Sequence, residues 1–334
     1  MPLPLMISDL ISASINTESS DKAELIQTHI SFIILTDSYV YKIKKPVNLG
    51  FLDFSTIEKR RFYCMQELEL NRRLSPDIYI GLLEVRKREG HFFYDGKGEL
   101  VDYAIKMRRI PEDLMMLNLL KKGAVDLQMV ENVARTIADF HRDAQRGDAI
   151  STFGRPEAVR ENIKENFLQT ERYIGKTVSY EKYHAIKEYA LDFINQNSAL
   201  FKKRMDKGRI RDCHGDIHME HVCIADKIYI YDCIEFNDRF RYGDVASDIA
   251  FLAMDLDFHE EKKLSDKFVE SYIKASGDEE IMLLIDFYKC YRACVRAKVD
   301  SFELDDPSLS EEEKEEAGRI ARKYFDLAFC YAGK

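Results

Sequence analysis

The chain has 334 residues, and its 50 lysines and arginines against 59 aspartates and glutamates give a net charge of −9. Hydrophobic residues at 46% and charged residues at 33% are typical of a globular protein and exclude a disordered or collagen-like chain. The acidic balance argues against sequence-independent binding to nucleic acid. Because no apolar run approaches the roughly 20 residues that cross a bilayer, we expect no membrane protein.

The cysteines and the first residues indicate the compartment. Seven cysteines occur, an odd number, and none belongs to a CxxC pair. The first positively charged side chain is Lys22, so we expect no secretory signal. These features predict reduced thiols and a cytoplasmic protein.

Residues 28–110 are predicted to form strands around one helix. Two β-rich runs flank residues 36–38 and predict a hairpin. On its second strand Lys42 and Lys44 share a face with Val40, so either this face is wet or a lysine has an anionic partner beneath the sheet. Further strand-like runs lie between residues 79 and 110.

The helix of this first part is predicted from its ends. Ser55 and Glu58 match a capping box, and the residues that follow are mainly helix formers. Pro76 ends the helix because the residue before a proline disfavours helical backbone.

Residues 111–334 are predicted to be mainly helical. Asp126 matches a cap at the start of one helix, and Ser310 with Glu313 matches a capping box on the last one. A short β island between about residues 210 and 231 interrupts the helices. We therefore predict an α+β fold with a β-rich small lobe, residues 1–110, and a helical large lobe, residues 111–334.

Two carboxylates of the β island are placed for chemistry. Asp216 lies in a loop after a short strand, and Asp232 lies at the end of an apolar strand. A turn at residues 226–227 pairs the neighbouring strands, so we expect both acids at the same rim. Such a pair suits phosphoryl transfer, in which one acid accepts the proton of the attacking hydroxyl and the other holds Mg²⁺ on the phosphates.

Five sequence motifs carry a family resemblance over roughly residues 25 to 300: KIKKPV, FLDFST, LNRRL, CHGD and DCIEFNDR. The chain resembles the aminoglycoside phosphotransferase family, a branch of the protein-kinase-like two-lobe fold. The resemblance implies ATP as the cofactor, Asp216 as the catalytic residue and Asp232 as the metal ligand. It also implies that Lys42 contacts the nucleotide phosphates and that Glu67 pairs with this lysine.

Two of these assignments have a competing residue nearby. Lys44 competes with Lys42 because a small shift of register exchanges them, and Glu69 competes with Glu67 on the same polar helix. Adenine is expected at the backbone of Met107 to Arg109. Asp244 and Asp248 are expected to be structural, one of them capping a helix.

One position departs from the family pattern. The family has an asparagine five residues after the catalytic aspartate, and here that residue is His221. Since Mg²⁺ prefers oxygen ligands, Glu220, Glu235 or Asn237 is a candidate for the missing oxygen, or the site uses Mn²⁺. An alternative is a nucleotide-binding pseudokinase that acts as a sensor or scaffold.

Two other kinds of metal site are disfavoured for this part of the chain. A zinc site is disfavoured because the spacing matches no common pattern among His214, His218, His221, Cys213 and Cys223. A metallophosphoesterase site is disfavoured because the stretch before residues 216–218 is polar and the chain has no Gly-Asn pair.

The acceptor is predicted from a basic helix near residues 286–300. Tyr288, Arg292 and Arg296 recur at intervals of four and share a face, which favours a small anionic acceptor that carries a hydroxyl. The alternative is a solvated basic face. We predict a small-molecule kinase with no nucleic-acid or membrane partner, and a protein acceptor is a further alternative.

Overall fold

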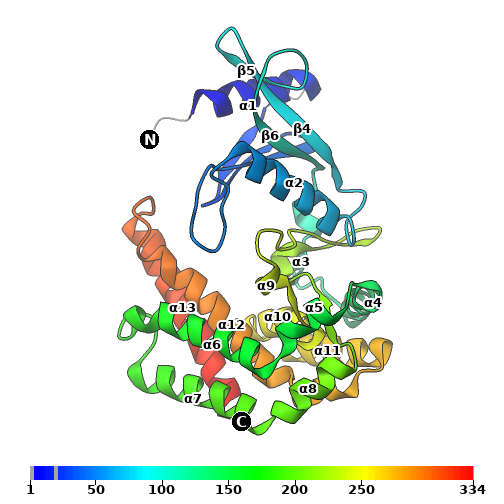
Figure 1. Ribbon diagram of the computed structural model, residues 1–334, viewed down its shortest axis with the longest axis vertical. Helices are drawn as coiled ribbons and strands as arrows, with labels where there is room; N and C mark the ends of the chain where they lie inside the picture. Colours follow the sequence, from blue (N-terminus) through cyan, green and yellow to red (C-terminus); the bar gives the residue numbers. More distant parts are fainter. Residues whose placement is uncertain (1–3, 19–21, 334) are drawn as a thin grey trace. The chain divides into compact units, whose positions relative to one another are not determined.

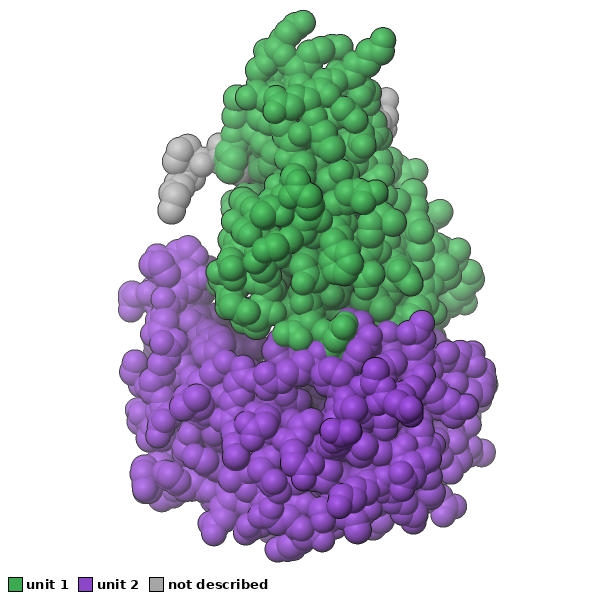
Figure 2. All heavy atoms as spheres, in the orientation of Figure 1, with its two compact units in different colours: residues 1–118, 221–238 green, residues 119–220, 239–334 purple. Residues whose placement is uncertain are grey.

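The computed structural model describes residues 4–18 and 22–333. The chain forms two compact units, residues 1–118 with 221–238 and residues 119–220 with 239–334 (Figure 2). The predicted lobes divide at residue 110, whereas residues 111–118 and 221–238 group with the first unit. The second of these segments joins it because it packs against residues of the sheet and of its helix.

The first unit is built on one antiparallel sheet of six strands in the order β1-β2-β3-β6-β4-β5. Figure 1 labels β4, β5 and β6 of this sheet. Its strands are β1 (Glu24–Gln27), β2 (Ser31–Leu35), β3 (Tyr39–Lys44), β4 (Tyr79–Arg88), β5 (His91–Tyr94) and β6 (Glu99–Arg108). The pairing of β2 with β3 confirms the predicted hairpin, and it sets Ile33 opposite Lys42.

Two helices of this unit, α1 (Leu5–Glu18) and α2 (Ile57–Asn71), supply apolar residues to two separate cores of the sheet. Leu10 of α1 belongs to a buried cluster with Ile43 of β3. Leu68 of α2 belongs to the other cluster, with Ile105 of β6. Helix α1 and strand β1 were not predicted.

Helix α2 begins one residue later than its predicted capping box. The Thr56 side chain accepts a hydrogen bond from the Lys59 backbone, so Thr56 is the cap. The predicted cap, Ser55, instead donates from its backbone and its hydroxyl to Asp53. The local turn at Asp53 therefore occupies the residue that the sequence pattern favours as the cap.

The predicted β island is divided between the units. Strands β8 (Val222–Ile224) and β9 (Ile228–Ile230) form the expected hairpin in the first unit. Ser75 donates from its hydroxyl to the Ile230 carbonyl, and Asn71 accepts from the Cys233 backbone, which joins the hairpin to the end of α2. Strand β7 (Ile210–Asp212) pairs with β10 (Tyr242–Asp244) in the second unit.

The second unit is helical, as predicted. Its longer helices are α4 (Leu127–Asp143), α6 (Pro156–Thr170), α7 (Tyr180–Gln196), α8 (Ser198–Asp206), α10 (Val245–Phe258), α11 (Lys262–Ser276), α12 (Ile285–Glu303) and α13 (Glu311–Ala332). Its short helical turns are α5 (Asp148–Ser151), η2 (Thr152–Gly154), η3 (Glu171–Tyr173) and η5 (Glu279–Leu283). A further turn, η1 (Glu112–Leu114), belongs to the first unit, and three others contain residues of both units: α3 (Met116–Lys121), η4 (Met219–His221) and α9 (Asp238–Arg241). The predicted caps at Asp126 and Ser310 are confirmed.

Helix α10 lies at the centre of this unit. It contacts α11, α12 and α13, and 12 of its 14 residues are buried. A helix that is apolar on all sides is stable only when other elements surround it.

Among the residues described, no helix combines the length and the apolarity that a bilayer crossing needs.

Candidate active site

Two lysines of β3 meet one carboxylate of α2. Lys42 and Lys44 project from the same face because side chains alternate along a strand. The Lys42 Nζ lies 2.8 Å from Glu67 Oε1, and the Lys44 Nζ donates to Glu67 Oε2 at 2.6 Å. Glu67 is fully buried, whereas Glu69 is exposed. The anionic partner beneath the sheet is therefore present, and it is Glu67.

The opposite charges of this group shift one another's pKa values in the direction that favours the charged forms. Burial lowers the pKa of Lys42, but Asp232 and Glu67 outweigh burial and raise this pKa well above its usual value. Burial raises the pKa of Glu67, and the two lysines outweigh it and lower the pKa. Lys42 and Glu67 therefore stay charged near neutral pH.

Asp232 completes the group at the end of the β8–β9 hairpin. Its Oδ1 accepts from the Lys42 Nζ at 2.6 Å, and its backbone N–H donates to the Tyr79 hydroxyl. Asp232 has φ 62°, a left-handed conformation that costs a non-glycine residue about 1 kcal/mol or more. Side-chain exposure is 41% for Asp232 and 13% for Lys42, against 1% for Lys44. Lys42 is thus the lysine that a ligand can reach.

The first unit offers a partial fit to a divalent cation. In the group around Lys42, the three carboxylates of Glu67, Asp232 and Glu235 outnumber the two lysines by one, and burial raises the pKa of Glu235. The Asp232 carboxylate is the oxygen ligand that a hard cation prefers. His221 Nε2 lies 3.6 Å from Asp232 Oδ2, a nitrogen that suits Mn²⁺ better than Mg²⁺. Glu235, one of the predicted substitutes for the family asparagine, is instead paired with Lys44.

The other two predicted substitutes differ in their placement. Asn237 belongs to the first unit, and its amide nitrogen donates to the Phe51 carbonyl at 3.2 Å. Glu220 belongs to the second unit. Whether either supplies an oxygen to a metal stays a prediction.

The predicted adenine segment lies at the end of β6. Met107 is buried in the α2 core, opposite Val40 of β3. Arg109 donates from its backbone to Ser38 and from its guanidinium to the Thr36 carbonyl. The segment is thereby fixed to the β2–β3 turn, and its contact with adenine stays a prediction.

In the second unit, carboxylates of α10 hold the loop that contains Asp216. Asp248 accepts from the backbone N–H groups of His214 at 2.9 Å and of Gly215 at 2.8 Å. Asp255 accepts from the Met219 backbone at 2.8 Å. Three backbone donors of this loop are therefore satisfied by one helix.

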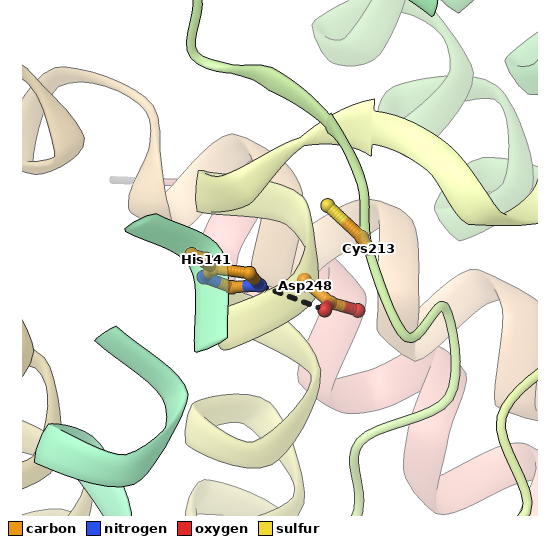
Figure 3. A group of neighbouring side chains, drawn as sticks. All are labelled: His141, Cys213 and Asp248. Carbon is orange, nitrogen blue, oxygen red and sulfur yellow. Dashed lines mark hydrogen bonds and ion pairs between the residues drawn. The ribbon is translucent and has the colours of Figure 1, made fainter. Parts of the chain in front are cut away.

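A buried histidine supports Asp248 (Figure 3). His141 Nε2 lies 3.0 Å from Asp248 Oδ2, and its Nδ1 lies 2.7 Å from the Tyr272 hydroxyl. Cys213 lies beside them, and its Sγ donates to the Gly243 carbonyl. These residue types are able to bind a metal, but the atoms are engaged with protein groups, so the cluster serves as an anchor for the loop. Burial raises the pKa of Asp248, and His141 outweighs it and lowers the pKa to about 2.

Asp216 itself is 31% exposed and has a histidine neighbour. His218 Nε2 lies 3.6 Å from Asp216 Oδ2. Burial lowers the pKa of His218, but the Asp216 carboxylate outweighs burial and raises it. Asp216 belongs to the second unit and Asp232 to the first, so their convergence on one metal stays a prediction.

The basic face of α12 points into the protein. Arg292 is buried, and its guanidinium donates to the carbonyls of Gly215 and Ser247 at 3.0 and 3.1 Å. The Arg296 guanidinium lies 5.7 Å from the centre of the Tyr324 ring. Arg292 thus braces the loop of Asp216, a role that the sequence did not suggest. Recognition of an anionic acceptor by this face stays a prediction.

No protein-family model matches the chain. It is 34% identical over 275 residues to uncharacterised proteins of Mycobacterium bovis and Mycobacterium tuberculosis, which covers 82% of this chain and 54% of those proteins. The chain therefore spans about half the length of these curated relatives.

Solved structures agree over nearly the whole chain. A choline/ethanolamine kinase family protein from Mesorhizobium loti has a TM-score of 0.53 at 10% identity, with 97% of both chains covered. A protein assigned to the aminoglycoside phosphotransferases from Ralstonia eutropha has 0.54 at 12%, also with 97% of both chains. Amicoumacin kinase hAmiN in complex with AMP-PNP, Ca²⁺ and Ami has 0.54 at 13%, with 96% of this chain and 95% of its own covered. The chain therefore has the α+β, two-lobe, protein-kinase-like fold of the aminoglycoside phosphotransferases and the choline/ethanolamine kinases.

Proposed function

We propose that the protein is an ATP-dependent kinase that transfers the γ-phosphoryl group to a hydroxyl of a small molecule. The observation that carries the proposal is the group of Lys42, Glu67 and Asp232, in which a reachable lysine is held between a buried and an exposed carboxylate. Support comes from a structural neighbour, amicoumacin kinase, which was solved with a nucleotide analogue and a divalent cation.

Each residue has one task in this proposal. Lys42, oriented by Glu67, binds the phosphates of ATP, and Asp232 holds Mg²⁺ or Mn²⁺. The metal supplies charge neutralisation on the phosphates. Asp216 orients the acceptor hydroxyl and accepts its proton, while Asp248 and Arg292 keep the loop of Asp216 in place. Catalysis is therefore positioning and electrostatic stabilisation.

A second candidate is a nucleotide-binding protein without turnover. The observation that favours it is His221, which lies 3.6 Å from Asp232 where the family resemblance predicts an asparagine. A nitrogen ligand at this position weakens the hold on Mg²⁺. In this alternative the first unit still binds nucleotide, and phosphoryl transfer does not follow.

One experiment separates the two candidates. The protein is incubated with ATP and either Mg²⁺ or Mn²⁺ against sugars, sugar acids, nucleosides and aminoglycosides, and phosphorylated products are detected by mass. For a kinase, Asp216→Asn lowers turnover by about 10²- to 10⁴-fold and retains ATP binding. The control is Asp139→Asn, which removes an exposed carboxylate of α4. Metal-dependent ATP binding without any product in the wild type would support the second candidate.

A further inference from the structure

The second lysine of β3 is enclosed more tightly than the first. Lys44 is 1% exposed, and its Nζ donates both to Glu67 and to Glu235 Oε1. The Phe54 ring lies below the ammonium, with 4.6 Å between the Nζ and the ring centre. Lys44 therefore has no surface to offer a nucleotide, and its role is to hold protein groups.

Its partner Glu235 comes from the segment that carries the candidate metal ligand. Glu235 lies three residues after Asp232, and its side chain is 6% exposed. Two further contacts hold the same segment, because Asp232 donates from its backbone to Tyr79 and Cys233 donates to Asn71. The segment also has two ion pairs with β3, and of these the pair of Lys44 with Glu235 is buried, whereas Asp232 in the pair with Lys42 is 41% exposed.

Stability alone gives little reason for such a pair. Taking two charges out of water costs about as much as their attraction returns, so a buried ion pair is weak evidence for stability. A segment with left-handed backbone at Asp232, in contrast, keeps that conformation only when its surroundings determine it. The pair of Lys44 and Glu235 provides such a constraint, because Lys44 belongs to the sheet and Glu235 to the segment.

We propose that Lys44 and Glu235 are a positioning couple that holds the segment of Asp232 against β3 and α2. The couple touches neither nucleotide nor metal. Because Lys44 also binds Glu67, it links the carboxylate that orients Lys42 to the segment that presents Asp232. The inference rests on the proposed function, since it adds two positioning residues to the same nucleotide and metal site.

The test replaces the couple and leaves the net charge of the site unchanged. The variant Lys44→Met/Glu235→Leu removes one positive and one negative charge together. The matched control is Lys45→Met, which removes the next lysine of the chain, whose Nζ donates to the Thr28 carbonyl. Binding of a fluorescent ATP analogue is titrated with Mn²⁺, with Mg²⁺ and without metal, and amide hydrogen exchange is followed over residues 231–237.

A positioning role predicts a selective loss. In the double variant, the gain in nucleotide affinity that metal provides falls about tenfold or more, as expected when groups behind a metal ligand are removed. Amides of residues 231–237 exchange about tenfold faster, while Lys45→Met matches the wild type in both measurements. A folded double variant with metal-dependent affinity and exchange within about twofold of the wild type overturns the proposal.

The variant Glu235→Gln and the exchange measurement decide the cases in which the double variant does not fold or the wild type binds no nucleotide. If the double variant does not fold, Glu235→Gln is used, because it keeps an oxygen acceptor for Lys44. An intermediate loss of metal-dependent affinity and faster exchange in Glu235→Gln support the couple, and unchanged values overturn it. A wild type that binds no nucleotide overturns the proposed function. Exchange over residues 231–237 still decides whether the couple holds this segment.

Discussion

Replacing Asp248 by asparagine tests how the loop of Asp216 is held. The carboxylate accepts from the backbone N–H groups of His214 and Gly215, and its Oδ2 also lies 3.0 Å from His141 Nε2. Asparagine keeps the size of the side chain and removes one acceptor oxygen. An NH₂ group then faces a backbone donor or the histidine at a position that is 1% exposed.

The expected loss follows from the bonds that asparagine cannot make. Hydrogen bonds to charged groups contribute about 1.5–3 kcal/mol each, and at least one of the two backbone bonds is lost. The pKa of Asp248, about 2 against 3.8, corresponds to about 2 kcal/mol of preference for the carboxylate in the folded protein. We therefore expect Asp248→Asn to lower the free energy of unfolding by about 2–4 kcal/mol at pH 7.

Urea unfolding at several pH values measures this loss. The folded pKa is lowered, so the stabilisation is present above the unfolded pKa of 3.8 and is lost as the pH falls toward about 2. The difference between wild type and variant should therefore shrink between about pH 4 and pH 2. Asp139→Asn, on the exposed surface of α4, serves as the control. A variant within about 0.5 kcal/mol of the wild type at pH 7 would refute the reasoning.

Three further predictions concern the second unit. Arg204 is fully buried between Asp244 and Asp278, so Arg204→Met should lower the free energy of urea unfolding by about 3–5 kcal/mol; a loss below about 1 kcal/mol would contradict this. Burial raises the pKa of Asp300 from 3.8 to about 6, so the wild type loses stability as the pH rises through that window. Asp300→Asn should then raise the free energy of unfolding by about 1–3 kcal/mol at pH 8 and by almost nothing at pH 4, and equal effects at both pH values would speak against it. Arg292→Met should lower kcat by about tenfold or more and change the acceptor KM little, because Arg292 contacts the loop backbone; a rise in KM alone would instead indicate acceptor binding.

The sequence allowed a good part of the first unit to be predicted. Strand parity placed Lys42 and Lys44 on one face, and helix α2 brought Glu67 beneath them, as the resemblance implied. The predicted cap of α2 was wrong by one residue, because the Ser55 hydroxyl donates to Asp53 and does not cap the helix. Helix α1 was missed because its apolar residues form no strong stripe.

The supports of the site were beyond sequence reasoning. Glu235 meets Lys44 across 191 positions of the chain, and no local pattern encodes such a contact. Asp248 was expected to be structural, but its partners are backbone N–H groups, which every residue carries. Arg292 likewise donates to backbone carbonyls. Its charge led us to predict an anionic ligand, whereas its hydrogen bonds are made to acceptors within the protein.

The two carboxylates of α10 hold the loop of Asp216 at two points whose separation is set by the helix. Asp248 and Asp255 are seven residues apart, which places them on the same side of the helix and about 10 Å apart along its axis. Inserting or deleting one residue between them would rotate one carboxylate by about 100° about the helix axis relative to the other. That carboxylate would no longer face the loop, and one end of the loop would be released. The span of α10 between these positions should therefore tolerate exchanges of side chains far better than any change of length.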